Sequence, residues 1–387
     1  MTGSACVVER VADLSATEWN ALDHEGYPFT RYEFLSALES TGCIGDHTSW
    51  RPRIIALRDE HGLAAAAPVW LRDNSYGEFV FDFAWAQAYA RHRLRYYPKL
   101  VVAAPFTPAT GPRLLVRAEL AIDPLQREYW RCKLQQALLT IVERDSFSSV
   151  HLLFPTTAEL ETLGPEWLAR IDCQFHWHNR GYRDFNDFLT TFTAEKRKKA
   201  KRERRRVAEA GIRFESRLGS EASLNEILIA WQLHRMTFLR RGNEPYLAAE
   251  TFAQIARTMG DTLLFKFAML AGEIVAVAVF FVGLDTLYGR YWGSVEDYHS
   301  LHFETCYHQG IEFCIERGLA RFEPGTQGEH KVSRGFVPTR THSAHFIAEP
   351  RFRVAIADYL KQEREAVDRY AAGMSERVPY RESLVLP

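Results

Sequence analysis

A glycine-rich segment late in the chain has the densest set of side chains that could do chemistry. It reads EPGTQGEHKVSRGF, Glu323–Phe336, and follows a predicted strand, where α/β sheets usually place ligands. Acyl transfer to an amine needs a proton acceptor and donors for an oxyanion. The side chains here that could supply them are Glu323, Gln327, Glu329, His330, Lys331 and Arg334, and the glycines that permit positive φ are Gly325, Gly328 and Gly335. The alternative is a polar loop that only turns the chain.

A second candidate group lies between Leu287 and Gly310. Alternation along a strand predicts that Tyr288, Arg290 and Trp292 share one face, and Arg290 would suit a carboxylate or phosphate. In the helix that follows, Glu304 is a candidate general base. The alternatives are that the two rings pack in the core and that Glu304 only favours the helix dipole.

One short segment is strongly basic, although the net charge of the chain is only −1. Between Lys196 and Arg206 there are nine Lys or Arg and one Glu, so the rest of the chain has 39 basic and 48 acidic residues. Thr193 can cap a helix here and Gly211 can end it, and the charges surround its axis. The candidate phosphate contacts are Lys196, Arg197, Lys198, Lys199, Lys201, Arg202, Arg204 and Arg205. Either they bind RNA, DNA or a phosphorylated cofactor, or they pair with acids of the same protein.

The first half contains an unusual proline-rich run, His92–Leu115. We expect a rigid loop there, in which Tyr97, Lys99 and Arg113 form a wall that binds the acceptor. A structural crossover is the alternative.

Several chemistries lack their motifs. His176 and His178 alternate without further ligands, and neither HExxH nor CxxC occurs, so no metal site is expected. Without GxSxG, GxGxxG or a Walker loop, serine hydrolysis, nucleotide redox and kinase chemistry have no support. The six scattered cysteines suit a reducing compartment. Neither a membrane-length apolar stretch nor a signal-peptide pattern occurs, so we expect a soluble cytoplasmic protein.

The elements that would position these residues repeat along the chain. With 387 residues, 47% of them hydrophobic, the chain can form two cores. An apolar hairpin, a helix and a strand occur in that order within 53–154 and again within 263–323. Asp123-Pro124 opens the first helix, and Gly318 closes the second. This pattern predicts a duplicated α/β unit, followed by a closing helix over about 350–370.

These segments resemble the bacterial Fem-like family described as peptidoglycan biosynthesis/recognition, which belongs to the GNAT acyltransferase superfamily. The runs that carry the resemblance are DNSYGEFVFDFAWAQAY (Asp73–Tyr89), RYYPKLVVAAPFTPATGPRLL (Arg95–Leu115), QFHWHNRGY (Gln174–Tyr182), LYGRYWGS (Leu287–Ser294), LHFETCYHQGIEFCIERGL (Leu301–Leu319) and EPGTQGEHKVSRGF. The resemblance implies two tandem GNAT-like domains, each a mixed, mostly antiparallel twisted sheet flanked by helices. We expect an acceptor-side domain over 1–165 and a domain over 166–387 that binds the donor and carries the catalytic residues.

Fem-type aminoacyltransferases move an amino acid from aminoacyl-tRNA to a peptide amine. Their second domain opens with a basic helix, to which Lys196–Ile212 is similar. Their late Gly-x-x-x-Phe-Lys-x-x-Phe-Gly signature resembles Gly328–Phe336, which implies a role near the acyl group for Lys331. The segment departs from that signature, because His330 replaces an aromatic residue, Gly328 lies closer to the lysine, and the final glycine and phenylalanine are reversed.

These observations together predict an N-acyltransferase that works by direct attack of a primary amine bound between the two halves. Glu304 or Glu323 would accept the proton, Lys331 with His330 would stabilise the oxyanion, and Arg290 would orient the acceptor. No tightly bound cofactor is expected. The pyrophosphate loop of CoA-dependent acetyltransferases is missing, which favours aminoacyl-tRNA or a carrier-bound acyl group over acyl-CoA as co-substrate. The alternatives are acyl-CoA-dependent acetylation and a non-catalytic module that binds RNA or murein.

Overall fold

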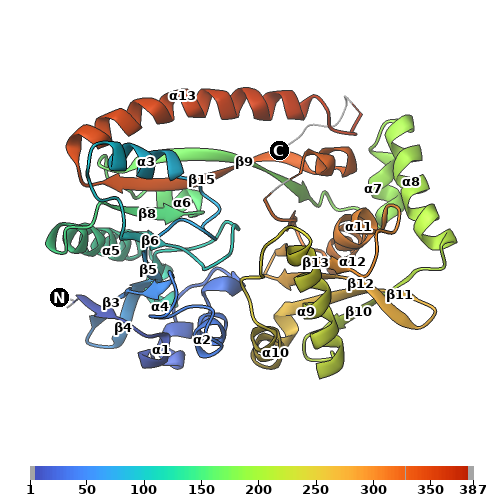
Figure 1. The fold of residues 1–387 in the computed structure, drawn as a ribbon, viewed down its shortest axis with the longest axis horizontal. Coiled ribbons are helices and arrows are strands. Elements are labelled where there is room, and N and C mark those ends of the chain that lie inside the picture. Colours follow the sequence, from blue (N-terminus) through green and yellow to red (C-terminus); the bar gives the residue numbers. More distant parts are fainter. Residues whose placement is uncertain (1–4, 327, 382–387) are drawn as a thin grey trace. The chain divides into compact units, whose positions relative to one another are not determined.

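The chain folds into two compact units in a computed structural model that describes residues 5–326 and 328–381 (Figure 1). Unit 1 comprises the residues up to Asp172 together with Arg340–Val367, and unit 2 comprises Cys173–Thr339 and the residues from Asp368 onward. The expected α/β class, with mixed and mostly antiparallel sheets flanked by helices, is confirmed. None of the described helices combines the length and apolar character that crossing a membrane requires.

Unit 1 contains a small antiparallel sheet and the strands of a larger mixed one. The small sheet has the order β1 (Ala5–Val8), β3 (Ile54–Asp59), β4 (Gly62–Ala67), β7 (Leu115–Val116). The larger one contains β2 (Arg51–Pro52), β5 (Val69–Arg72), β6 (Lys99–Val102) and β8 (Ser149–Leu153). The helical elements are η1 (Val11–Asp13), α1 (Ala16–Asn20), η2 (Pro28–Thr30), α2 (Tyr32–Ser40), α3 (Phe83–Arg91), α4 (Ala118–Ala121), α5 (Pro124–Arg144) and α6 (Thr157–Leu160).

Helix α5 begins where the sequence predicts. The Asp123 side chain accepts a hydrogen bond from the amide of Leu125, and Pro124 occupies the first turn. Its buried stripe packs into the core of unit 1 and consists of Trp130, Leu134, Leu138 and Val142. This helix therefore covers one face of the unit 1 strands, as a helical apolar stripe should.

Unit 2 is built on β10 (Arg213–Leu218), β11 (Leu263–Leu270), β12 (Glu273–Val282), β13 (Thr286–Ser294) and β14 (Arg321–Glu323). Its helical elements are α7 (Phe185–Thr190), α8 (Ala194–Glu209), α9 (Leu224–Leu239), α10 (Ala249–Thr258), η3 (Gly260–Thr262), α11 (Leu301–Phe303), the π-helical turn η4 (Glu304–His308), α12 (Gln309–Arg317) and the 3₁₀ turn η5 (Glu329–Arg334). Gly318 closes α12 with a φ of 68°, as predicted. The basic helix is confirmed as α8, although the expected side-chain cap at Thr193 is wrong, because that side chain makes no capping hydrogen bond.

The same strand arrangement occurs in both units. In unit 1, β5 pairs antiparallel with β6, which pairs parallel with β8. In unit 2, β12 pairs antiparallel with β13, which pairs parallel with β14. Helix α5 connects the parallel strands of unit 1, and α12 lies in the connection between those of unit 2. The observed element order therefore matches the predicted repeat of hairpin, helix and strand.

Each unit takes its next strand from the other half of the sequence. Strand β9 (Leu168–His178) follows β8 along the chain, yet its end pairs antiparallel with β14 of unit 2. Strand β15 (Val337–Ile347) follows β14, yet Ser343–Ile347 pair with β8 of unit 1, as the orange and green strands in Figure 1 show. Helix α13 (Pro350–Ser375) contributes residues to both units. The observed division therefore differs from the expected domains 1–165 and 166–387, because Arg340–Val367 belong to unit 1.

A β-bulge interrupts the alternation expected along β13. Between the pairs Val279–Tyr291 and Phe280–Gly289, Arg290 is an extra residue. Tyr288 therefore opposes Phe281, whereas Trp292 opposes Ala278, three positions earlier on β12. Since opposed residues point to the same face of a sheet, Tyr288 and Trp292 lie on opposite faces. The prediction that these two rings share a face with Arg290 is wrong.

Candidate active site

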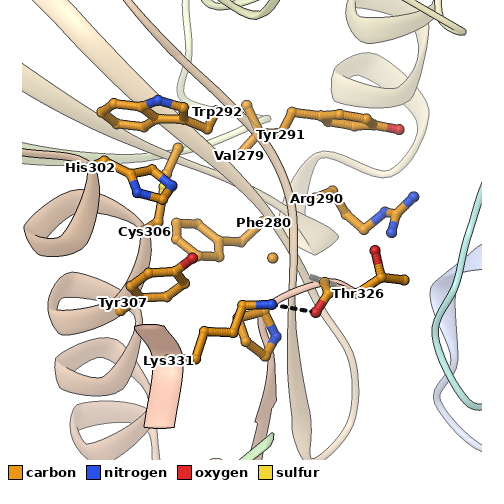
Figure 2. Close-up of a pocket in the computed structure, with 14 residues that line it drawn as sticks. Val279, Phe280, Arg290, Tyr291, Trp292, His302, Cys306, Tyr307, Thr326 and Lys331 are labelled. Atoms are coloured by element: carbon orange, nitrogen blue, oxygen red, sulfur yellow. Dashed lines mark hydrogen bonds between the residues drawn. The ribbon is translucent and has the colours of Figure 1, made fainter. Parts of the chain in front are cut away.

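A cavity of about 210 Å³ lies in unit 2, where β13 and β14 separate (Figure 2). The two strands pair in parallel from Thr286 to Tyr288 and from Arg321 to Glu323, and the described pairing ends there. Residues just beyond this point line the cavity. The lining consists of Ala278, Val279, Phe280, Gly289, Arg290, Tyr291, Trp292, His302, Cys306, Tyr307, Pro324, Gly325, Thr326 and Lys331. The carboxyl ends of two diverging parallel strands thus form its walls, which is where α/β sheets bind ligands.

Lys331 is the titratable group that dominates this cavity. Its side chain is 1% exposed, and its Nζ donates a hydrogen bond of 2.6 Å to the carbonyl oxygen of Gly325 (dashed in Figure 2). Burial lowers its pKa from 10.5 to about 7. Near neutral pH, Lys331 therefore exchanges a proton with little cost in either direction.

The side of the cavity that His302, Cys306 and Tyr307 form is neutral. Figure 2 shows His302, Cys306 and Tyr307 together on one side, and Arg290 with Thr326 on the other. Burial lowers the pKa of His302 to about 4 and raises the pKa of Cys306 and of Tyr307. The imidazole, thiol and phenol are therefore all uncharged at pH 7. Since no Asp or Glu occurs among the described lining residues, Lys331 and Arg290 set the charge of the cavity.

His330 lies beside this wall. Its Nε2 and the hydroxyl of Tyr307 are hydrogen-bonded at 2.8 Å, and burial lowers the pKa of His330 to about 4. It therefore contacts the cavity through Tyr307 as a neutral ring.

Glu304 lies outside the described lining of the cavity and is fully engaged elsewhere. Its carboxylate accepts hydrogen bonds from Arg204 at 3.1 Å, His308 at 2.9 Å and Gln309 at 2.8 Å. Burial alone would raise its pKa, but the hydrogen bond from His308 and the charge of Arg204 lower it to about 2. A carboxylate held in this way is a poor proton acceptor, so we do not retain Glu304 as the base.

Three further residues predicted to belong to the site are not found among the described residues that line the cavity. Glu323 is buried, and its Oε1 lies 4.0 Å from Nδ1 of His176; it is not part of the described lining. Arg334 is also buried, and its guanidinium pairs with Glu203 instead of facing the cavity. Gln327 lies outside the described residues.

The expected acceptor wall in unit 1 is contradicted by burial. Lys99 is inaccessible and pairs with Glu78 at 2.8 Å and with Asp82. Burial alone would lower the pKa of Lys99, but these two carboxylates raise it. Arg113 is also inaccessible and donates to carbonyl oxygens of its own unit, those of Ala109, Gly111, Pro112 and Leu153. Neither cation can reach a substrate, and the half-buried Tyr97 hydroxyl is hydrogen-bonded to Ser75 at 2.9 Å.

The outer face of α8 is cationic. One side of the helix is buried through Ala200, Glu203 and Val207. Arg204 pairs with Glu304 and Glu312, and Arg205 pairs with Glu209 on the surface. Within the described part of the chain no ion pair involves the exposed side chains of Lys198, Lys199, Lys201 and Arg202, whereas Lys196 and Arg197 are partly buried.

Sequence reasoning missed several side chains of the cavity lining, among them Cys306, Thr326, Tyr291 and the β12 residues Ala278, Val279 and Phe280. Cys306 could have been found, because it lies four residues after His302 and such pairs share a helix face. Thr326 is only one residue from Gly325 in the segment already selected. The β12 residues form part of the wall because β13 bulges at Arg290, and no sequence pattern indicated that bulge.

A comparison of the sequence with models of known protein families identifies the family of this chain. The fold and the site define an α/β protein with a cavity between two diverging strands. The sequence matches the FemAB-like model, described as peptidoglycan biosynthesis/recognition, over residues 10–382. The chain belongs to the FemAB-like family, and this membership supports a transferase.

Solved structures agree with this assignment at the level of fold. The structure resembles FemX with a TM-score of 0.53 at 9% identity, over 92% of this chain and 100% of FemX. It also resembles a conserved protein of unknown function from Bacteroides thetaiotaomicron, with a TM-score of 0.50 at 11% identity, over 88% of this chain and 99% of the other. A search of curated proteins finds no match. At such identities the structural likeness shows the fold alone.

Proposed function

We propose that the protein transfers an acyl group, and an aminoacyl group in particular, from an ester-linked donor to a primary amine by direct attack. The observation that carries this proposal is Lys331, a buried lysine whose pKa is about 7, in a cavity whose other titratable side chains are neutral or cationic. The FemAB-like family supports transferase activity. The acceptor is an amine-bearing small molecule or peptide, and the donor is aminoacyl-tRNA or a carrier-bound acyl group.

In this proposal Lys331 performs the proton transfers. The neutral acceptor amine attacks the donor carbonyl, and a C–N bond forms as the carbonyl oxygen gains negative charge. Neutral Lys331 takes the proton that the attacking nitrogen loses, and the resulting ammonium then donates it to the departing ester oxygen as the C–O bond breaks. A group with a pKa near the working pH is suited to both steps. This assignment replaces Glu304 as base.

The other cavity side chains stabilise charge and orient the substrates. Arg290 supplies a permanent positive charge beside the cavity, which favours the oxyanion or a carboxylate of the acceptor. The Tyr307 hydroxyl faces Arg290 across the cavity (Figure 2) and is hydrogen-bonded to Nε2 of His330 at 2.8 Å; when the neutral ring carries its proton on Nε2, the phenol can donate to a substrate. The donor's phosphates would bind the outer face of α8, where at least four basic side chains are exposed.

The direct test is transfer with defined donors. Purified protein is mixed with radiolabelled aminoacyl-tRNA or acyl-CoA and a panel of amines, and product is counted for the parent, for Lys331→Ala and for the matched control Lys361→Ala on the surface of α13. We expect turnover with aminoacyl-tRNA, its loss in Lys331→Ala and its retention in the control.

Other outcomes of this test identify other functions. Turnover with acyl-CoA alone would replace the tRNA donor by an ordinary acyl-CoA-dependent mechanism. Salt-dependent RNA binding with no turnover from either donor would mean a non-catalytic binding module, which the cationic face of α8 also fits. Equal turnover by the parent and Lys331→Ala would remove Lys331 from the mechanism.

A further inference from the structure

Two adjacent residues of α8, Glu203 and Arg204, connect this helix to both turns that form the cavity. Glu203 is 8% exposed and lies on the buried stripe between Ala200 and Val207. A carboxylate in such a stripe is costly unless it is paired. Each of the two residues forms an ion pair with a different element, and these elements carry Lys331, Cys306 and Tyr307 of the cavity lining.

Glu203 contacts the turn that presents Lys331. Its Oε1 accepts a hydrogen bond of 2.8 Å from the guanidinium of Arg334, the last residue of η5. The same guanidinium donates to the carbonyl oxygen of His330 at 2.6 Å and lies 3.4 Å from the ring centroid of Phe303. Arg334 therefore ties η5 to α8 and to the end of α11, and Lys331 lies within the tied segment.

Arg204 contacts the turn that presents Cys306 and Tyr307. It donates to Glu304 at 3.1 Å and to Glu312 at 2.8 Å, on η4 and α12. Cys306 and Tyr307 lie two and three residues after Glu304 in η4. A π-helical turn has a weaker local hydrogen-bond pattern than an α-helix and is often found at functional sites, so an external anchor can fix its position.

We propose that Glu203 and Arg204 are positioning residues, which clamp the Lys331 turn and the neighbouring Cys306–Tyr307 turn to one rigid helix and thereby fix the position of Lys331 relative to Tyr307. The inference rests on the proposed function only in assigning catalysis to this cavity, and it holds whatever the donor is. Stability alone is a weak reason for two such pairs, since buried ion pairs often stabilise no better than apolar side chains of similar size. Directional hydrogen bonds do fix geometry, and transfer depends on it.

The contact between Glu203 and Arg334 is tested through the ionisation of Lys331, without any substrate. The parent, Glu203→Ala and Glu203→Gln are labelled with limiting acetic anhydride from pH 6 to 11, and modification of the Lys331 peptide is followed by mass spectrometry. Because burial lowers this pKa, release of η5 lets water in, and we expect an upward shift of about one unit or more in Glu203→Ala. Glu203→Gln keeps the hydrogen bond and should lie close to the parent. Glu209→Ala, which removes an exposed carboxylate of the same helix, is the matched control.

The contact of Arg204 with Glu304 is tested through the thiol of Cys306, which is partly buried in the cavity wall. We expect Arg204→Ala to raise the rate of maleimide labelling of Cys306 about tenfold, and Arg204→Lys to restore the slow rate in part. Thermal unfolding of each variant shows whether the change is local. If Glu203→Ala does not fold, Glu203→Asp takes its place: it keeps the charge, but its shorter side chain cannot hold Arg334 in the same position, and a smaller upward shift is expected. If Arg204→Ala does not fold, Arg204→Lys takes its place, with labelling of Cys306 still faster than in the parent.

The outcomes separate this inference from the proposed function. A Lys331 pKa that is unchanged, or that falls because only a negative charge is lost, overturns the positioning role of Glu203; unchanged Cys306 labelling overturns that of Arg204. In transfer assays, Glu203→Ala should lower kcat about tenfold with KM within twofold of the parent. If labelling of Lys331 and Cys306 changes as expected but the parent protein transfers no acyl group, the positioning role of Glu203 and Arg204 is supported and the proposed function is rejected.

Discussion

Nζ of Lys331 lies 2.6 Å from the carbonyl oxygen of Gly325, six residues earlier in the same segment. This contact fixes the nitrogen, and it is stronger when the nitrogen is an ammonium, so by itself it favours the protonated form. Burial then decides the protonation state and lowers the pKa to about 7. The segment thus holds a proton-exchanging group at a defined point of the cavity.

The first prediction concerns the pH dependence of transfer. If neutral Lys331 accepts the proton, kcat should rise about tenfold per pH unit below pH 7 and level off above it. Steady-state rates between pH 6 and 8.5, at saturating substrate, measure this profile. Lys331→Arg keeps a cation but cannot titrate in this range, so we expect a loss of about 10²-fold or more. A flat profile would rule out this proton acceptor.

The second prediction concerns stability. The pKa of Lys331 is about 7 in the folded protein, against an ordinary 10.5. Between these values the unfolded chain binds more protons, so this residue's contribution makes stability rise with pH from about 7 to 10.5. Lys331→Met should therefore be more stable than the parent at pH 6.5, by roughly 1 kcal/mol or more, and this advantage should shrink toward pH 10. Urea unfolding at both pH values measures it.

The third prediction concerns acid. Burial lowers the pKa of His24 and His234 to about 4 and of His151 and His176 to about 3. Below pH 6.5 the unfolded chain therefore binds more protons than the folded one, and stability must fall as the pH falls toward 4. Each group contributes up to about 1.4 kcal/mol per pH unit. Urea midpoints at pH 7, 6 and 5 should drop progressively, and a constant midpoint would contradict the neutral buried histidines.

The fourth prediction concerns the outer face of α8. We expect the quadruple change Lys198→Gln, Lys199→Gln, Lys201→Gln and Arg202→Gln to weaken tRNA binding and to reduce the slope of log K against log salt by up to about 3, since each phosphate contact contributes about 0.7. Filter binding from 50 to 300 mM salt measures the slope. Four cations changed elsewhere, on α13, give the control: the exposed Arg351, Lys361 and Arg369 and the half-buried Arg364. Equal slopes for both variants would exclude α8 as the phosphate site.

The fifth prediction tests the packing of α9 on β13. A Cβ on Gly293 would lie 2.1 Å from the backbone carbon of Leu233, which cannot move without displacing the helix. Gly293→Ala should therefore lower the free energy of unfolding by about 3 kcal/mol. Gly373→Ala in α13 meets no atom within 4 Å, and should be neutral or stabilising by up to about 1 kcal/mol. Urea unfolding of the two variants gives the comparison.

Local signals in the sequence predicted the local structure well. The proline and aspartate that open α5, the glycine that closes α12 and the apolar hairpin β11–β12 all lie where expected. Helix α9 was missed, although Ser223 and Glu226 form the capping box that would have indicated it. These features depend on a few neighbouring residues, which is why they can be read from a single sequence.

Features that depend on distant partners could not be predicted. The exchange of β9 and β15 depends on which strand each one meets, and the bulge at Arg290 depends on the register with β12. Burial has the same origin: Lys99 and Arg113 look like substrate contacts in the sequence, but the fold surrounds them with acceptors. Lys331 was predicted because its motif is local, whereas its lowered pKa comes from the surrounding core.

The exchange of β9 and β15 has a practical consequence for dissecting this protein. A polypeptide cut after residue 165 would lack the β15 residues that border β8, and one that starts at residue 166 would retain them with no β8 to pair with. Exposed strand edges of this kind promote aggregation. Fragments 1–165 and 166–387, produced separately, should therefore be insoluble. When both are produced in the same cell, β8 and β15 can pair again, and the fragments should become soluble together.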